Sequence, residues 1–140
     1  MKHYYFLISL CFLFFISCGQ QKIMKTIPKN EINILRTALD ENGCKESVRI
    51  FTNKENFDDF QKSLLIPGQR NAPLHIVDFT TKNVAVICKE DIDSYELSEL
   101  TTTSKHNFLK LNKNENKFDE PINLLVIEIP KEINRLTLEY

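Results

Sequence analysis

Short apolar segments separated by turn residues predict a series of β-strands. Residues 84–88 (VAVIC) form a continuous apolar run between polar neighbours, which is typical of a strand in the centre of a sheet. In residues 136–140, Leu136, Leu138 and Tyr140 lie on one face and polar side chains on the other. By the same criteria, further strands are predicted at residues 47–51, 95–100, 107–111 and 122–129.

The segment from Glu31 to Leu39 fits two patterns. Ile32 and Ile34 alternate with polar residues, which favours a strand. Ile32, Leu35 and Leu39 also have the spacing of one face of a helix. We favour the strand and leave the helix open.

One helix is predicted between the strands. Thr52 or Asn53 can cap its start, and Phe57, Phe60 and Leu64 then fall on one face. One helix among six or seven short strands, with frequent turn signals, predicts a mainly β domain of the α+β class. We expect an antiparallel sandwich or a barrel-like domain.

The first twenty residues carry a targeting pattern. After Lys2, residues 4–16 are almost wholly apolar, about as long as a signal-peptide core and too short to span a bilayer as a helix. The run ends at Ser17-Cys18, which resembles a bacterial lipobox. The resemblance implies cleavage before Cys18 and attachment of palmitate-type acyl chains to that cysteine. An ordinary signal peptide or an uncleaved anchor would be the alternatives.

This pattern divides the chain and indicates its location. We expect a lipoprotein signal peptide at residues 1–17, a tether at 18–29 and a β-rich domain at 30–140. No aspartate directly follows Cys18, which favours the outer membrane of a bacterial cell envelope. Whether the domain faces the periplasm or the exterior stays open, as does its oligomeric state.

The charge balance argues against nucleic-acid binding. The chain has 18 Lys and Arg against 19 Asp and Glu, and Lys2 is the sole one of these charged residues before Cys18. The remaining chain is therefore nearly neutral, without a basic stripe.

Two cysteines remain if Cys18 carries lipid. Cys44 and Cys88 would form an even pair in an exported protein, which suggests a disulfide. Such a bridge would stabilise the fold by roughly 4 kcal/mol in the chain-entropy model. Two separate free thiols are the alternative.

The sequence contains no recognisable catalytic or metal-binding motif. His75 and His106 are the histidines after the signal region, and neither belongs to a hydrolase motif. The acidic stretch at residues 90–93 lacks the pattern of a calcium loop, and the cysteines and histidines are too scattered for a zinc site. We therefore expect no cofactor, no metal and no enzyme activity.

The order of motifs resembles a known family. A strand, a helix and a proline loop precede residues 73–87 (PLHIVDFTTKNVAVI), and residues 121–131 (PINLLVIEIPK) follow. This order is similar to the PrcB-type domain, the protease-complex subunit family of exported bacterial proteins, over about residues 30–140. The best-matched piece joins Val77-Asp78-Phe79 to residues 84–86. Members commonly carry a Gly-Gly-Tyr segment after the central strand, and here only its tyrosine, Tyr95, persists.

The resemblance implies a non-catalytic module that binds or stabilises an exported partner such as a protease. Loops on rigid scaffolds carry recognition, so residues 89–95 are the candidate contact surface, with Asp91, Asp93 and Tyr95 as contact residues. Tyr95 could instead begin an inward-facing row of a strand. The other functional hypotheses are an envelope hydrolase with a spatially assembled site and a structural, immunity or inhibitor lipoprotein.

Overall fold

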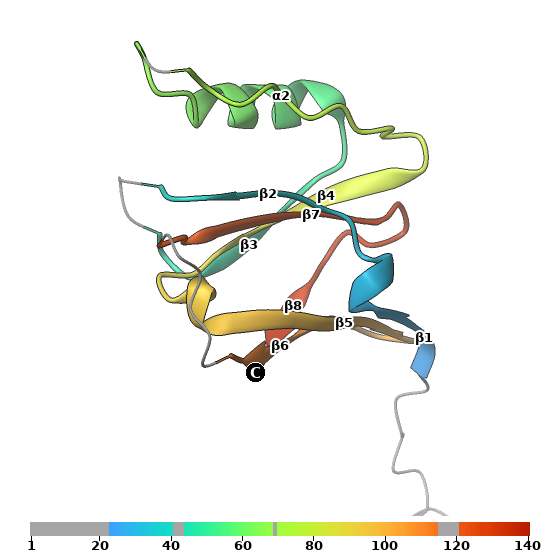
Figure 1. Cartoon of the computed structure of the whole chain (residues 1–140). Coiled ribbons are helices and arrows are strands. Elements are labelled where there is room, and N and C mark those ends of the chain that lie inside the picture. The colour runs from blue at the N-terminus through green and yellow to red at the C-terminus, as the bar shows by residue number, and fades with distance from the viewer. Residues whose placement is uncertain (1–22, 41–43, 69, 115–120) are drawn as a thin grey trace, which may run out of the picture.

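The computed structural model describes residues 23–40, 44–68, 70–114 and 121–140. Their elements form three layers, with the helix on one sheet and that sheet on a second one (Figure 1). In chain order, the elements are β1 (Ile23–Pro28), the 3-10 turn η1 (Lys29–Glu31), β2 (Ile34–Ala38), β3 (Ser47–Phe51), helix α2 (Lys54–Ser63), β4 (Lys82–Cys88), the 3-10 turn η2 (Ile92–Ser94), β5 (Tyr95–Thr103), β6 (Asn107–Lys113), β7 (Leu124–Pro130) and β8 (Thr137–Glu139). The predicted mainly β class with one short α-helix is confirmed for the described residues.

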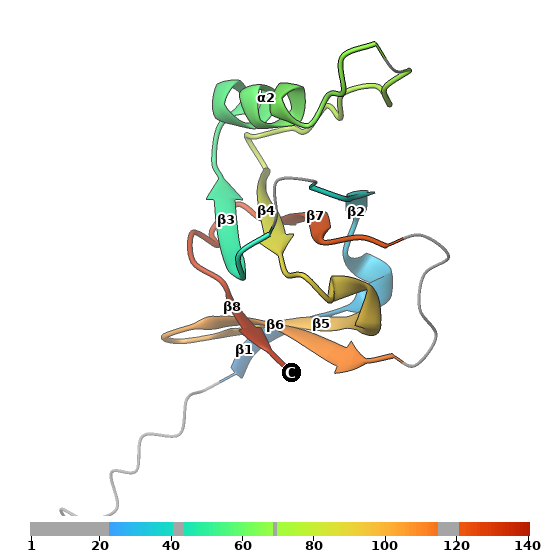
Figure 2. The ribbon, with the colours of Figure 1, turned by 90° about the vertical axis from the view of Figure 1, so that its left-hand side faces the viewer.

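The two sheets differ in their strand directions. The first sheet, under the helix, has the order β2-β7-β4-β3 and is antiparallel throughout. The second sheet has the order β1-β5-β6-β8, and β8 runs parallel to β6. The described part of the chain thus has eight strands and one parallel pair, where six or seven antiparallel strands were predicted. The parallel pair arises because the chain leaves the first sheet after Pro130 and crosses to the second sheet (Figure 2).

The segment predicted as a tether contributes a strand. β1 pairs with β5, and Ile27 opposite Leu100 is only 8% exposed. The lysines and the proline of this segment suggested a tether. A proline at the end of an edge strand, however, removes no hydrogen bond that the sheet needs. The folded part of the described chain therefore includes Ile23–Pro28, which the sequence had assigned to the tether. The strand favoured for residues 31–39 is present in shorter form as β2, Ile34–Ala38, an edge strand of the first sheet, and Glu31 belongs to η1 instead.

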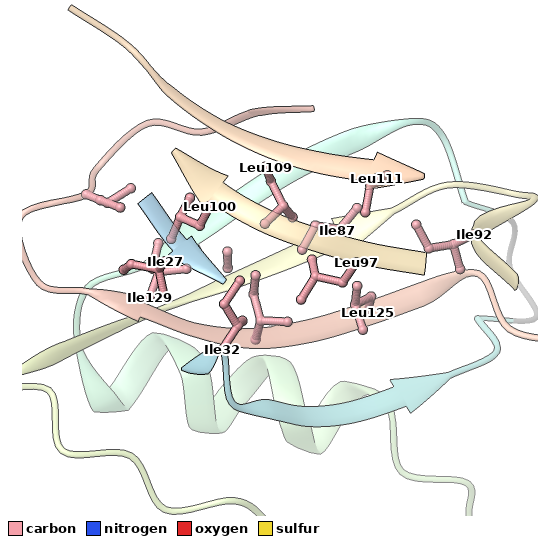
Figure 3. Close-up of a cluster of buried hydrophobic side chains, with 13 residues drawn as sticks. Ile27, Ile32, Ile87, Ile92, Leu97, Leu100, Leu109, Leu111, Leu125 and Ile129 are labelled. Atoms are coloured by element: carbon pink, nitrogen blue, oxygen red, sulfur yellow. The ribbon is translucent and has the colours of Figure 1, made fainter. Parts of the chain in front are cut away.

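The main core lies between the sheets (Figure 3). Leu97 and Leu100 of β5 both point into it, although they are three residues apart, because the register with β6 shifts between Leu97 and Glu99. Such a bulge lets two residues with odd spacing share one face. Opposite them, Ile87 and Ile127 of the first sheet are fully buried.

The helix covers a second core on the other face of the first sheet. Phe57 packs there beside Val84 and Val86 of β4. Alternate β4 residues point to the main core, so β4 is buried on both faces, which explains its continuous apolar run. The helix starts at the cap Asn53, whose side chain accepts a hydrogen bond of 2.9 Å from the Asn56 backbone N–H. The predicted alternative cap, Thr52, does not take this role.

Candidate functional site

A cavity opens at the end of the sandwich where β5 begins. Its volume is about 430 Å³, and residues of both sheets line it. The inner wall consists of leucine and isoleucine side chains, among them Ile92, Leu97 and Leu111, each at most 5% exposed. Leu125 and Ile122 extend this apolar wall on the side of the first sheet. The arrangement is typical of a site that receives an apolar group.

The mouth of the cavity is polar and charged. Lys29 forms an ion pair with Glu96, and both side chains are about half exposed. Solvent screens such a pair, so it adds little to stability and can rearrange around a bound molecule. Thr37 and Asn114 complete the polar part of the lining. Ile34 also lines the cavity and is 43% exposed, which places an apolar side chain at the surface beside it.

The predicted contact loop forms one wall of this cavity. Residues 92–94 fold into η2, where the Ser94 backbone N–H donates to the Asp91 carbonyl at 2.9 Å. The Ser94 carbonyl in turn accepts from the Asn114 N–H at 2.8 Å. These bonds turn Ile92 inward, where it is 2% exposed. The segment is therefore part of the scaffold and not a freely projecting loop.

The three predicted contact residues have different surroundings. Asp91 is exposed and lies 2.6 Å from the Lys89 ammonium. Tyr95 is half-buried, lines the cavity and packs its ring against Tyr140, with the centroids 5.3 Å apart. Asp93 is half-buried within η2. Asp91 and Tyr95 thus already contact other side chains of the domain, and of the three residues only Tyr95 lines the cavity.

A lysine links these residues to the end of the chain. The Lys89 ammonium lies 5.1 Å from the ring centroid of Tyr95, 5.0 Å from that of Tyr140 and 3.7 Å from Glu46. Its hydrogen bond to Asp91 raises the pKa of Lys89 and lowers the pKa of the Asp91 carboxyl. The Tyr140 hydroxyl donates to Glu46 at 2.6 Å. Although Tyr140 is 56% exposed, desolvation of its hydroxyl and this hydrogen bond raise the pKa of Tyr140 to about 12.

The structure joins Cys44 and Cys88 in a disulfide, the pairing that the sequence suggested. Their Cα atoms are 5.5 Å apart, within the ordinary range for a disulfide. The bridge connects the segment before β3 to the end of β4. Because Lys89 follows Cys88 directly, the disulfide lies at the same end of the molecule as Lys89 and its contacts with Glu46, Asp91, Tyr95 and Tyr140.

Two side-chain amides hold loops in place in a way that the sequence did not indicate. Gln61 donates to the His75 carbonyl at 3.0 Å and accepts from the His75 N–H at 2.6 Å. Asn123 makes the equivalent pair of bonds to the backbone of Asp40, at 2.7 and 3.0 Å. Each side-chain amide satisfies both the N–H and the carbonyl of one backbone residue, as a paired strand would. Because its polar atoms have these partners, Gln61 can be only 2% exposed although it lies on a surface helix.

The remaining candidate chemistry is dispersed. Neither His75 nor His106 lines the cavity, and the ring of His106 lies 6.0 Å from that of Phe108. Within the described ranges, no three His, Cys, Asp or Glu side chains are grouped so that they could hold a metal ion. In the same residues, no helix has the length and apolar character needed to cross a membrane.

The predicted signal peptide and Cys18 lie outside the described residues. No protein-family model, curated protein or solved structure matches this chain.

Proposed function

We propose that this chain is a lipid-anchored, non-catalytic binding module of a bacterial envelope, which holds an extended segment of an exported partner protein. The observation that carries the proposal is the cavity of about 430 Å³ at the end of the sandwich. Ligand sites typically have volumes of about 300–1,000 Å³, with mostly apolar walls and a few polar groups. An apolar side chain of the partner fits this apolar interior and polar mouth.

The strand beside the cavity favours a peptide as the bound group. Among the strands that the structure describes, β2 pairs with β7 alone, and as an edge strand it presents backbone donors and acceptors on its other side. Ile34 and Thr37 of this strand line the cavity. An extended segment that pairs with β2 can place alternate side chains toward the sandwich, and one of these enters the cavity. Hydrogen bonds to the backbone then give affinity, and the cavity gives preference for an apolar residue.

Two sequence resemblances support the cellular setting. The lipobox-like segment at Cys18 implies a lipid anchor, and the resemblance to the PrcB-type domain implies an exported partner such as a protease. The charged pair at the mouth, Lys29 with Glu96, offers the partner one group of each sign. Together these features favour protein recognition in the bacterial envelope.

The test is recovery of a partner by crosslinking and affinity purification from the cells that make the protein. Thr37→Trp fills the cavity mouth from an exposed position, and Thr52→Trp is the matched control at an exposed position outside the cavity. We expect a stoichiometric partner with the parent protein and with Thr52→Trp, and its loss with Thr37→Trp. Equal recovery with both variants would show that the cavity is not the site. Recovery no better than with Cys18→Ala would argue against an envelope partner.

A further inference from the structure

We infer that one end of the second sheet rests on the anionic headgroups of the membrane that holds the lipid anchor. This end, here called the basic end, consists of residues 23–26, 101–108 and 134–138. The inference rests on the proposed lipid attachment at Cys18. It goes beyond the proposed function, because it states how the domain is oriented.

The length of chain before β1 limits where the domain can lie. β1 begins at Ile23, five residues after Cys18. A fully extended chain spans at most about 3.6 Å per residue, so the start of β1 lies within about 18 Å of the lipid-bearing residue. Six of the twelve residues predicted as tether belong to β1, so the first residues of β1 lie near the membrane surface.

The three segments of the basic end meet at the start of β1. Ile23 pairs with Thr103, where β5 ends and turns into β6. The turn is closed by the Thr103 N–H, which donates to the His106 carbonyl at 2.8 Å. The Asn107 side chain donates to the Arg135 carbonyl at 3.0 Å, which brings the segment before β8 to the same place.

The charge of this end has one sign. Its three segments contain Lys25, Lys105, His106 and Arg135, and no aspartate or glutamate. All four side chains are exposed. By contrast, five other lysines of the described chain form ion pairs: Lys29, Lys54, Lys62, Lys89 and Lys110. The basic end thus presents exposed positive charge where the anchor brings it to the membrane, and each Lys or Arg near an anionic surface strengthens association about fivefold.

The opposite end of the second sheet carries acidic groups. Asp91, Asp93 and Glu96 lie around the start of β5, beside the cavity. The nine residues of β5 separate the two ends by about 30 Å. In Figure 1, β5 starts at the left and β1 lies at the right. Asp91 and Glu96 are paired with Lys89 and Lys29, so this end offers no excess of positive charge, and an anionic membrane attracts the basic end in preference to it. The cavity then faces away from the bilayer, open to a partner.

The test uses the lipidated protein in nanodiscs that contain phosphatidylglycerol and a gadolinium-bearing lipid headgroup. The paramagnetic relaxation of each backbone amide then reports its nearness to the headgroups. We expect strong relaxation at residues 101–108 and little at residues 91–97. The variant Lys25→Gln/Lys105→Gln/Arg135→Gln should show a clearly smaller difference, whereas Lys45→Gln/Lys62→Gln/Lys113→Gln, with the same change in charge elsewhere, should keep it in full.

The outcomes separate this inference from the proposed function. Equal relaxation at both ends of β5, or an unchanged difference in the first variant, would overturn the membrane contact. Replacement of phosphatidylglycerol by phosphatidylcholine should reduce the difference to what the short chain after Cys18 alone imposes, because headgroup charge supplies the rest. The mass of the N-terminal peptide reports lipid attachment separately, and partner recovery reports the function of the cavity. A failed orientation with lipid present would thus leave the proposed function standing.

Discussion

The ring of Tyr140 packs against the ring of Tyr95, with the centroids 5.3 Å apart and the Lys89 ammonium within about 5 Å of both. This contact fixes the final residue of the sequence to the first residue of β5. It also supports the wall of the cavity, because Tyr95 lines it. Packing of Tyr140 against Tyr95 therefore both stabilises residue 140 and holds one wall of the proposed site in place.

Loss of the Tyr140 ring should weaken the fold. We expect Tyr140→Ala to reduce the free energy of unfolding by about 1–2 kcal/mol, because it removes an aromatic pair, a cation–π contact and a hydrogen bond. Tyr140→Phe keeps the ring and should cost about 0.5–1 kcal/mol. Urea unfolding measures both variants. Equal stability of Tyr140→Ala and the parent protein would show that this contact is absent in solution.

The hydroxyl of Tyr140 should titrate at unusually high pH. Residues 18–140 contain two tyrosines, so Tyr95→Phe leaves Tyr140 as the only one to be followed by ultraviolet absorbance. We expect a midpoint of about 12, since partial burial and the bond to Glu46 favour the neutral form. A midpoint near 10 would contradict the observed contacts.

The raised pKa of Tyr140 also determines how stability should change with pH. A folded-state pKa above the unfolded value of 10.0 means that folding favours the protonated phenol. This contribution is complete below pH 10 and disappears as the pH rises through 12. Tyr140→Phe should accordingly lose less stability over this interval than the parent protein.

The disulfide should contribute more to the free energy of unfolding than any single contact of Lys89. Cys44 and Cys88 have a sequence separation of 44, and closing a loop of this length stabilises by about 4 kcal/mol in the chain-entropy model. We expect Cys44→Ala/Cys88→Ala to lose roughly that amount in urea unfolding. Mass spectrometry after alkylation without reduction checks the pairing itself, and modification of both cysteines would disprove it.

Gln61 should hold the loop before β4. Gln61→Ala leaves the N–H and carbonyl of His75 without their partners, which we expect to cost about 1–3 kcal/mol. Hydrogen exchange at the His75 amide should become much faster. The neighbouring exposed variant Lys62→Ala is the control. Unchanged exchange at His75 in Gln61→Ala would show that the two Gln61–His75 hydrogen bonds do not hold this loop.

The strands that the sequence predicts well are those with a clear burial pattern. β4 is apolar along its length because it has a core on each face, and the cap of α2 follows from Asn53. β1 was missed because, among its residues whose side chains are described, Ile27 is the buried one, while a lysine and a proline suggest a tether. Its place in the second sheet depends on pairing with β5, seventy or more residues away, which local patterns do not contain.

The site was predictable only in part. The sequence indicated the region around Tyr95, and the structure places that residue at the cavity. The cavity itself needs residues from β2, η2, β5, β6 and β7, which only the tertiary fold brings together. The buried orientation of Gln61 was equally hidden, because its position in the helix is compatible with an exposed face.

Site-specific photocrosslinking in living cells tests the central proposal most directly. A photoreactive amino acid replaces Ile34 at the cavity mouth in one variant of the full lipidated protein, and Lys62 on the exposed face of α2 in another. We predict that the first variant crosslinks one exported protein and that Thr37→Trp in the same chain abolishes this product. Crosslinking from Lys62 to the same protein with none from Ile34, or a product insensitive to Thr37→Trp, would contradict binding at the cavity.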